Sequence, residues 1–185
     1  MGALPPVPLQ AAAPWWRPSH GHSLVIRGGR PLSGVYPISG AKNAVLPLMI
    51  SALLTPHLVT LRNVPASLDV AVLSALLRRL GAEMHWSTTA AGLSVTICAD
   101  RLHPGSIDGD LVSRMRASVL VLGAMLGRCG EASLPMPGGD AIGLRGVDFH
   151  LAGLRAMGAE IELAAGLIVA KAPDGLKGAE ILLPL

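Results

Sequence analysis

Residues 77–84 read LRRLGAEM, and residues 154–161 read LRAMGAEI, so one short pattern returns after 77 residues. A glycine at this place is typical of a helix that stops in a left-handed cap. Gly81 and Gly158 therefore predict the ends of two helices. A pattern that returns at a fixed distance indicates a repeated supersecondary unit.

The sequence around the two copies extends this repeat in both directions. Each unit is predicted to open with a glycine and a short extended segment, at residues 34–38, 105–108 and 178–183. An apolar helix, a strand that ends at a proline and a second helix follow, at residues 42–54, 58–64 and 69–80 or at residues 112–126, 131–136 and 147–157. Two further strands close each unit, at residues 83–87 and 93–99 or at residues 160–163 and 167–171. One unit thus reads strand, helix, strand, helix, strand, strand.

The repeat also predicts how the chain is divided. We expect a disordered extension over residues 1–23, one unit at about residues 34–104, a second at about 105–177, and a third that is cut short from residue 178. Helices alternating with strands indicate an α/β layer fold in which helices cover a sheet. An apolar strand edge left without a partner is avoided in native proteins, so we expect the natural protein to be longer.

Composition excludes several classes of protein. Half of the 185 residues are apolar and 15% are charged, which predicts a packed core rather than disorder. The net charge of +3 comes mostly from scattered arginines, without a basic stripe. Aromatic side chains that could stack on bases are few, so no nucleic-acid partner is predicted. The only aromatic residues are Trp15, Trp16, Trp86, Tyr36 and Phe149.

Metal, cofactor and membrane binding are not predicted either. Cys98 and Cys129 have no CxxC spacing, and the six histidines are scattered, so neither a metal site nor a hydrolase triad is indicated. No dinucleotide-binding fingerprint is present, and no cofactor is expected. The longest apolar runs are far shorter than the roughly 20 residues that cross a bilayer, so no membrane partner is expected. A reduced, cytoplasmic compartment fits this cysteine usage best.

Two helix starts carry a cation. In residues 39–44, SGAKNA, a glycine-bearing turn leads into an apolar helix, where free N–H groups and the helix dipole favour an anion and Lys42 adds a full charge. The alternative is a helix capped by Ser39 with a solvated lysine. Arg116 lies near the corresponding place in the second unit, where an ordinary surface arginine is the alternative.

Residues 135–150, PMPGGDAIGLRGVDFH, form the stretch richest in candidate groups. An irregular loop of this length in a compact domain is usually functional or disordered. Asp140 could act as a general acid if burial raised its pKa, and Arg145 could bind phosphate or carboxylate through its planar fork. The alternative for Asp140 is an ordinary turn after two glycines.

These motifs together resemble one family. Their order and spacing over about residues 24–185 are similar to those of the UDP-N-acetylglucosamine 1-carboxyvinyltransferases, which are enolpyruvyl transferases. The resemblance rests on residues 39–44, 63–65, 80–82, 115–118, 134–145 and 147–148. It implies an inside-out α/β barrel, with two domains of three repeated units each. It also implies transfer of enolpyruvate from phosphoenolpyruvate to the 3-hydroxyl of UDP-N-acetylglucosamine, the first committed step of peptidoglycan synthesis.

The resemblance also implies roles for individual residues. Lys42 and Asn43 match residues at the phosphoenolpyruvate and sugar sites, and Arg116 matches a residue that contacts the substrates' phosphates. A segment that contacts the UDP-sugar matches Arg145, Gly146, Val147, Asp148 and Phe149. Asp140 stands where most members carry a reactive cysteine, to which the epoxide antibiotic fosfomycin attaches. A carboxyl group can still donate a proton, so we expect a full-length enzyme that is active and resists fosfomycin.

The length of the chain limits what it can do alone. Members of this family are more than twice as long, and their second domain supplies further groups that close over both substrates. The 185-residue chain is therefore expected to be inactive without that missing C-terminal domain. Two alternatives stay open: the sister enzyme that acts on shikimate phosphate, and a remnant that binds UDP-sugar or nothing.

Overall fold

The computed structural model describes residues 25, 28–29, 31–89, 92–105, 107, 109–139 and 146–183. The extension predicted at residues 1–23 lies outside the described residues, as do Asp140 and Arg145. The first unit contains α1 (Lys42–Ser51), the 3-10 turn η2 (Ala52–Leu54), β1 (Val59–Leu61), α2 (Leu68–Arg79), β2 (Glu83–Thr89) and β3 (Gly92–Cys98). The second contains α3 (Gly109–Ser113), the 3-10 turn η3 (Arg116–Val119), α4 (Leu120–Cys129), β4 (Glu131–Pro135), α5 (Asp148–Ala156), β5 (Glu160–Ala164) and β6 (Leu167–Lys171).

The two units repeat one sheet topology. Each has a three-stranded antiparallel sheet whose third strand lies between the first and the second, in the orders β1-β3-β2 and β4-β6-β5. The helix ends predicted at Gly81 and Gly158 are confirmed, since these residues have φ values of 99° and 98°. Their N–H groups donate to the carbonyls of Arg78 and Arg155, at 3.0 and 2.9 Å.

The arginines that precede these glycines also repeat one contact. The guanidinium of Arg78 donates to the carbonyl of Met84 at 3.5 Å, and that of Arg155 donates to the carbonyl of Ile161 at 3.0 Å. Both pairs tie a helix end to the strand that follows it. The sequence repeat is therefore a repeat of side-chain contacts as well as of backbone.

Three details of the predicted secondary structure are wrong. The described residues of the opening segments, at 34–38, 105, 107 and 178–183, form no strand and pair with neither sheet. Ser39 does not cap α1, because the N-cap is Ala41, which makes no side-chain capping hydrogen bond. The single helix predicted over residues 112–126 is broken into α3, η3 and α4.

The break in that helix has a local cause. Met115 is extended, with φ −148° and ψ 127°, so the chain leaves the helical path between α3 and η3. The hydroxyl of Ser118, which is fully buried, donates to the carbonyls of Met115 at 2.6 Å and Val112 at 3.2 Å. Buried carbonyls need such partners when helical hydrogen bonds are missing. We call residues 113–116 the helix break.

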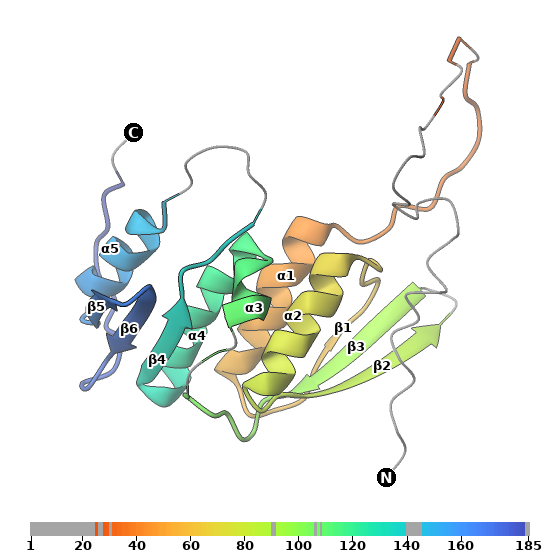
Figure 1. The fold of residues 1–185 in the computed structure, drawn as a ribbon. Helices are drawn as coiled ribbons and strands as arrows, with labels where there is room; N and C mark the ends of the chain where they lie inside the picture. The colour runs from red at the N-terminus through yellow and green to blue at the C-terminus, as the bar shows by residue number, and fades with distance from the viewer. Residues whose placement is uncertain are drawn as a thin grey trace.

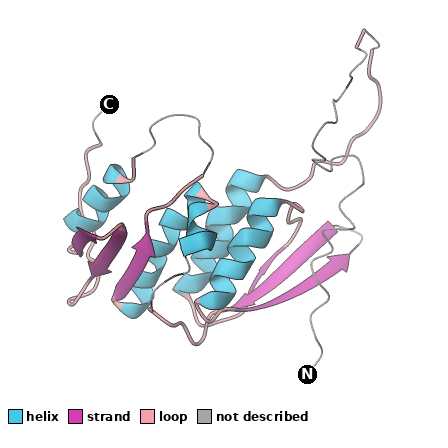
Figure 2. Ribbon diagram, viewed as in Figure 1, coloured by secondary structure: helices cyan, strands magenta, loops and turns pink. Residues whose placement is uncertain are grey.

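The core lies between the two sheets. Helices α1 to α4 pack side by side with the β1–β3 sheet on one flank and the β4–β6 sheet on the other (Figures 1 and 2). The buried residues of the described chain include no aromatic side chain. The largest fully buried side chains are Met49, Leu53, Leu73, Leu76, Leu77, Ile97, Leu122, Met125, Leu126, Leu134, Ile168 and Val95. No helix within the described ranges is both long and apolar enough to cross a membrane.

One side chain joins the two units directly. Arg128, in the last turn of α4, donates from Nη1 to the carbonyl of Leu53 and from Nη2 to the carbonyl of Ala99, both at 3.1 Å. These carbonyls belong to η2 and to the residue that follows β3, so one side chain of the second unit binds two separate segments of the first. Hydrogen bonds from a charged donor are stronger than neutral ones.

Replacing Arg128 by methionine should lower the free energy of unfolding by about 2 kcal/mol, because two partly buried carbonyls lose a charged donor. Urea denaturation followed by circular dichroism measures this change. The control is Arg101→Met, since Arg101 is 90% exposed and should change stability by less than about 0.5 kcal/mol. Equal stabilities for the two variants would show that the bridge contributes nothing.

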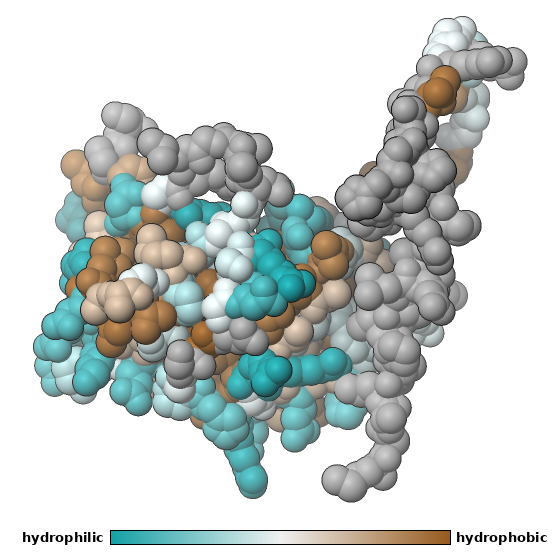
Figure 3. Space-filling view, viewed as in Figure 1, coloured by the Kyte–Doolittle hydropathy of each residue, from teal (hydrophilic) through white to brown (hydrophobic). Residues whose placement is uncertain are grey.

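The segment before α1 is exposed. Residues 31–40 project from the helical body as an arm, and Figure 3 shows hydrophobic side chains on it. The side chains of Leu32, Val35 and Ile38 are almost fully exposed, and so is that of Leu182 near the other end of the described chain. Exposed apolar side chains that lie together are typical of surfaces that contact another protein segment.

Candidate functional site

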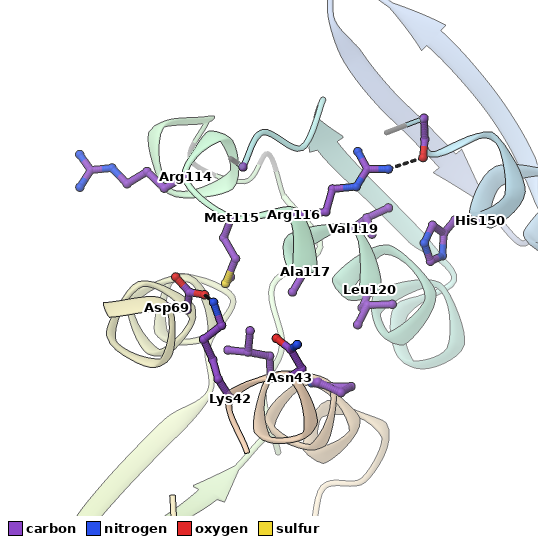
Figure 4. Close-up of a pocket in the computed structure, with 14 residues that line it drawn as sticks. Lys42, Asn43, Asp69, Arg114, Met115, Arg116, Ala117, Val119, Leu120 and His150 are labelled. Carbon is purple, nitrogen blue, oxygen red and sulfur yellow. Dashed lines mark hydrogen bonds and ion pairs between the residues drawn. The ribbon is translucent and has the colours of Figure 1, made fainter. Parts of the chain in front are cut away.

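A cleft of about 610 Å³ lies where the beginnings of α1 and α2 meet the helix break and the beginning of α5 (Figure 4). Both units contribute to it, although they are far apart in sequence. It is lined by Lys42, Asn43, Leu46, Pro47, Asp69, Arg114, Met115, Arg116, Ala117, Val119, Leu120, Gly139, Gly146 and His150.

The first turn of α1 supplies a cation and an amide to this cleft. Lys42 and Asn43 are the first two residues of α1. Val45 and Leu46, in the same helix, are buried and hold its start in place. Pro47 lies inside the helix and has no N–H, so the Asn43 carbonyl lacks its usual helical donor. The first turn of α1 therefore brings the Lys42 ammonium and the Asn43 amide to the cleft.

The start of α2 places a carboxylate against this cation. Lys42 Nζ lies 2.7 Å from Asp69 Oδ2, and Figure 4 shows the two side chains pointing toward each other. Asp69 is in the first turn of α2, where the helix dipole favours a negative charge. Ser67 caps this helix by accepting a hydrogen bond from the N–H of Val70 at 3.3 Å.

The helix break supplies two arginines that point in different directions. Arg116 donates a hydrogen bond from Nη2 to the carbonyl of Gly146, just before α5. A guanidinium has five N–H donors, so four of them are not used in this bond. Arg114 instead points away from the cleft in Figure 4 and pairs with Asp110 at 2.7 Å.

The same break holds the chain that follows β4. The N–H of Gly138 donates to the carbonyl of Val112 at 3.4 Å, and that of Gly139 donates to the carbonyl of Ser113 at 3.1 Å. A Cβ atom at Gly138 would lie 1.7 Å from the Ser113 carbonyl oxygen, so only glycine fits. The bonds of Gly139 and Gly146 thus attach both sides of residues 140–145 to residues 113–116.

The structure places the predicted site residues as follows. Lys42, Asn43, Arg116 and Gly146 line the one cleft, although they come from three separate parts of the sequence. Val147 is buried, whereas Asp148 and Phe149 are exposed in the first turn of α5, and none of the three is among the lining residues. Asp140 and Arg145 fall outside the described residues.

Asp69, Arg114 and His150 line the cleft but were not predicted to do so. His150 belongs to the predicted loop stretch, yet no motif distinguished it from the other scattered histidines. Asp69 could have been found from the sequence Ser67-Leu68-Asp69, which is typical of a capped helix start. What the sequence could not show is that this start lies beside Lys42.

The charges of the cleft favour an anion. Among the described residues that line it, Lys42 and Arg116 bring cations to the cleft against the carboxylate of Asp69, whereas Arg114 is paired with Asp110. A cleft with a net positive charge next to helix starts attracts phosphate and carboxylate groups. Cys129 is not part of it, and burial raises the pKa of the Cys129 thiol.

Known proteins resemble this chain in sequence and in fold. The sequence profile of EPSP synthase (3-phosphoshikimate 1-carboxyvinyltransferase) matches residues 26–185. A protein of Dinoroseobacter shibae named UDP-N-acetylglucosamine 1-carboxyvinyltransferase is 50% identical over 161 residues, which are 87% of this chain and 38% of that protein. A protein of the same name from Xanthobacter autotrophicus is 52% identical over 165 residues, 86% of this chain and 38% of that protein. The chain thus spans about two fifths of the length of these curated relatives.

Two solved structures have a similar fold. The enolpyruvyl transferase NikO from Streptomyces tendae superposes with a TM-score of 0.65 at 27% identity, over 82% of this chain and 32% of NikO. The EPSP synthase of Acinetobacter baumannii gives a TM-score of 0.51 at 16% identity, over 70% of this chain and 31% of that enzyme, which is a likeness of fold alone. The profile match covers most of the chain, and the repeated units and the anion-binding cleft agree with it. The chain belongs to the EPSP synthase (3-phosphoshikimate 1-carboxyvinyltransferase) family of enolpyruvyl transferases.

Proposed function

We propose that the protein of which this chain forms a part transfers enolpyruvate from phosphoenolpyruvate to the 3-hydroxyl of UDP-N-acetylglucosamine, the first committed step of peptidoglycan synthesis. The observation that carries the proposal is the cleft, in which Lys42 and Asn43 of the first unit face the same space as Arg116 of the second. The names of the curated relatives at about 50% identity support the same reaction.

The residues of the cleft suit both anionic substrates. Lys42, at the start of α1, binds the phosphate or carboxylate of phosphoenolpyruvate, and Asn43 supplies hydrogen bonds to the sugar. Arg116 contacts substrate phosphate with the donors that the Gly146 carbonyl leaves available. The UDP-sugar lies along the segment made of Arg145, Gly146, Val147, Asp148 and Phe149.

The reaction proceeds by addition and then elimination. The sugar 3-hydroxyl oxygen bonds to C2 of phosphoenolpyruvate while C3 takes up a proton, and the hydroxyl proton leaves to a base. Loss of phosphate from C2 and of a proton from C3 then restores the enol ether. Asp140 donates the proton to C3 in the first step, which requires its carboxyl to be protonated when the substrates are bound.

The complete enzyme has an inside-out α/β barrel architecture and a second, C-terminal domain. Support comes from the two sheets of equal strand order, from the helices between them, and from the length of the relatives. The second domain closes over both substrates and covers the exposed arm at residues 31–40. Reaction and substrates both place the enzyme in the cytoplasm.

The release of phosphate from phosphoenolpyruvate tests this proposal. The 185-residue chain and a version extended through the downstream reading frame are assayed side by side with UDP-N-acetylglucosamine. We expect activity in the extended protein alone, and activity in the short chain would show that one domain suffices. Release with shikimate 3-phosphate instead of the UDP-sugar would assign the sister reaction, and release with neither would overturn the proposed transferase.

A further inference from the structure

We propose that Asp69 is a positioning residue, whose carboxylate holds the Lys42 ammonium in the cleft at the place where phosphoenolpyruvate binds. The inference rests on the proposed function and adds to it a residue that none of the sequence motifs includes. Its starting point is the contact of 2.7 Å between Lys42 Nζ and Asp69 Oδ2.

A carboxylate in this cleft needs an explanation. Phosphoenolpyruvate and nucleotide phosphates are anions, and Asp69 is an acidic residue among the described side chains that line the cleft. Two like charges a few ångströms apart repel each other, so Asp69 taken alone weakens substrate binding. The side chains of Lys42 and Asp69 are 50% and 32% exposed, and such an ion pair contributes only about 0–1 kcal/mol to stability. Stability therefore does not account for the pair.

The ion pair is better explained if Asp69 fixes the position of the Lys42 ammonium. A lysine carries its charge on a flexible four-carbon stem, so its ammonium can occupy many places in an open cleft. Asp69 has a short side chain and belongs to a well-anchored helix. Ser67 caps the start of α2, and one face of this helix is buried, namely Val70, Leu73, Leu76 and Leu77. The carboxylate thus holds the ammonium group of Lys42 at one place in the cleft. Catalysis by positioning requires such fixed groups.

The opposite role would give the opposite kinetics. A carboxylate that merely competes with the substrate for Lys42 would lower the affinity of the enzyme for phosphoenolpyruvate. Its removal would therefore lower KM and leave kcat unchanged. A carboxylate that positions Lys42 acts on the reacting complex, so its removal lowers kcat. The two roles are therefore separated by the way in which kcat and KM change.

The first test uses the extended protein. For Asp69→Asn we expect kcat to fall by about 10-fold or more, while KM for phosphoenolpyruvate stays equal or decreases because a negative charge is lost. Asp69→Glu restores the charge one methylene further out and should recover part of kcat. The control is Asp100→Asn, which removes the same charge from an exposed ion pair with Arg101, neither residue of which lines the cleft, and should change kcat by less than about twofold.

Two outcomes would overturn the positioning role. One is an unchanged kcat in Asp69→Asn together with a lower KM, since this is the signature of a competitor. The other is a loss of kcat that accompanies an equal loss of thermal stability and is not recovered in Asp69→Glu, since this shows a structural role.

A second test does not depend on activity. In the 185-residue chain, acetic anhydride should acylate the Lys42 amine about threefold faster or more in Asp69→Asn than in the wild type, because the carboxylate that lies 2.7 Å from Nζ shields the amine from the reagent. Mass spectrometry reports the rate, with Lys171 and Lys177 as internal references. An unchanged rate would overturn the inference whatever the activity, whereas an inactive extended wild type would overturn the proposed function.

Discussion

Replacing Asp140 by cysteine should make the extended enzyme sensitive to covalent inactivation by fosfomycin, which leaves the wild type unaffected. A thiolate opens an epoxide far more readily than a carboxylate does, because sulfur is the stronger nucleophile. We expect the inactivation rate to rise by at least about 100-fold. The measurements are the time-dependent loss of phosphate release and the mass of the peptide that contains residue 140.

The control for this experiment is Asp140→Asn. An amide can neither open the epoxide nor give up a proton as a carboxyl group does, so this variant should resist fosfomycin and lose turnover by about 100-fold or more. Rapid labelling of the wild type at Asp140 would contradict the prediction of resistance. Full turnover in Asp140→Asn would remove Asp140 from the role of proton donor.

Replacing Gly138 by alanine should lower kcat/KM of the extended enzyme by about 100-fold. A Cβ atom there would lie 1.7 Å from the Ser113 carbonyl oxygen, so the backbone after β4 must move away from the helix break. That movement breaks the hydrogen bonds of Gly138 and Gly139 and shifts the start of residues 140–145. A shift of about one ångström at a reacting group is enough for a loss of this size.

The matched control is Gly105→Ala. A Cβ atom at Gly105 meets no atom of the described chain within 4 Å, so the same change should leave activity within about twofold of the wild type. Circular dichroism establishes that both variants are folded. Wild-type activity in Gly138→Ala would show that the attachment to Ser113 is not needed for catalysis.

The features that were predicted best are those that depend only on residues close together in the sequence. The helix ends at Gly81 and Gly158 follow from local backbone chemistry, and so do the strands that come after them, hence the repeat was visible without a structure. The helix break was not visible, because every residue between Val112 and Leu126 is compatible with a helix. It is held by Gly138 and Gly139, more than 20 residues further along the chain.

The same limit explains the missed and the misassigned elements. Residues 34–38 have the composition of a strand, but a strand also needs a partner, and the described residues offer none. Lys42 and Arg116 were predicted from the helix starts that carry them. Asp69 was missed, because its importance depends on two helix starts meeting in space.

The bridge that Arg128 makes to Leu53 and Ala99 has a consequence for cutting the chain. The repeat suggests that the chain could be cut near residues 101–104. The two halves, however, share one hydrophobic core, and Arg128 forms hydrogen bonds from one half to the other. Each half alone would expose the apolar helix faces that the other covers, so neither is an independent folding unit. A chain severed there is better regarded as a split protein, whose fragments fold only by binding each other.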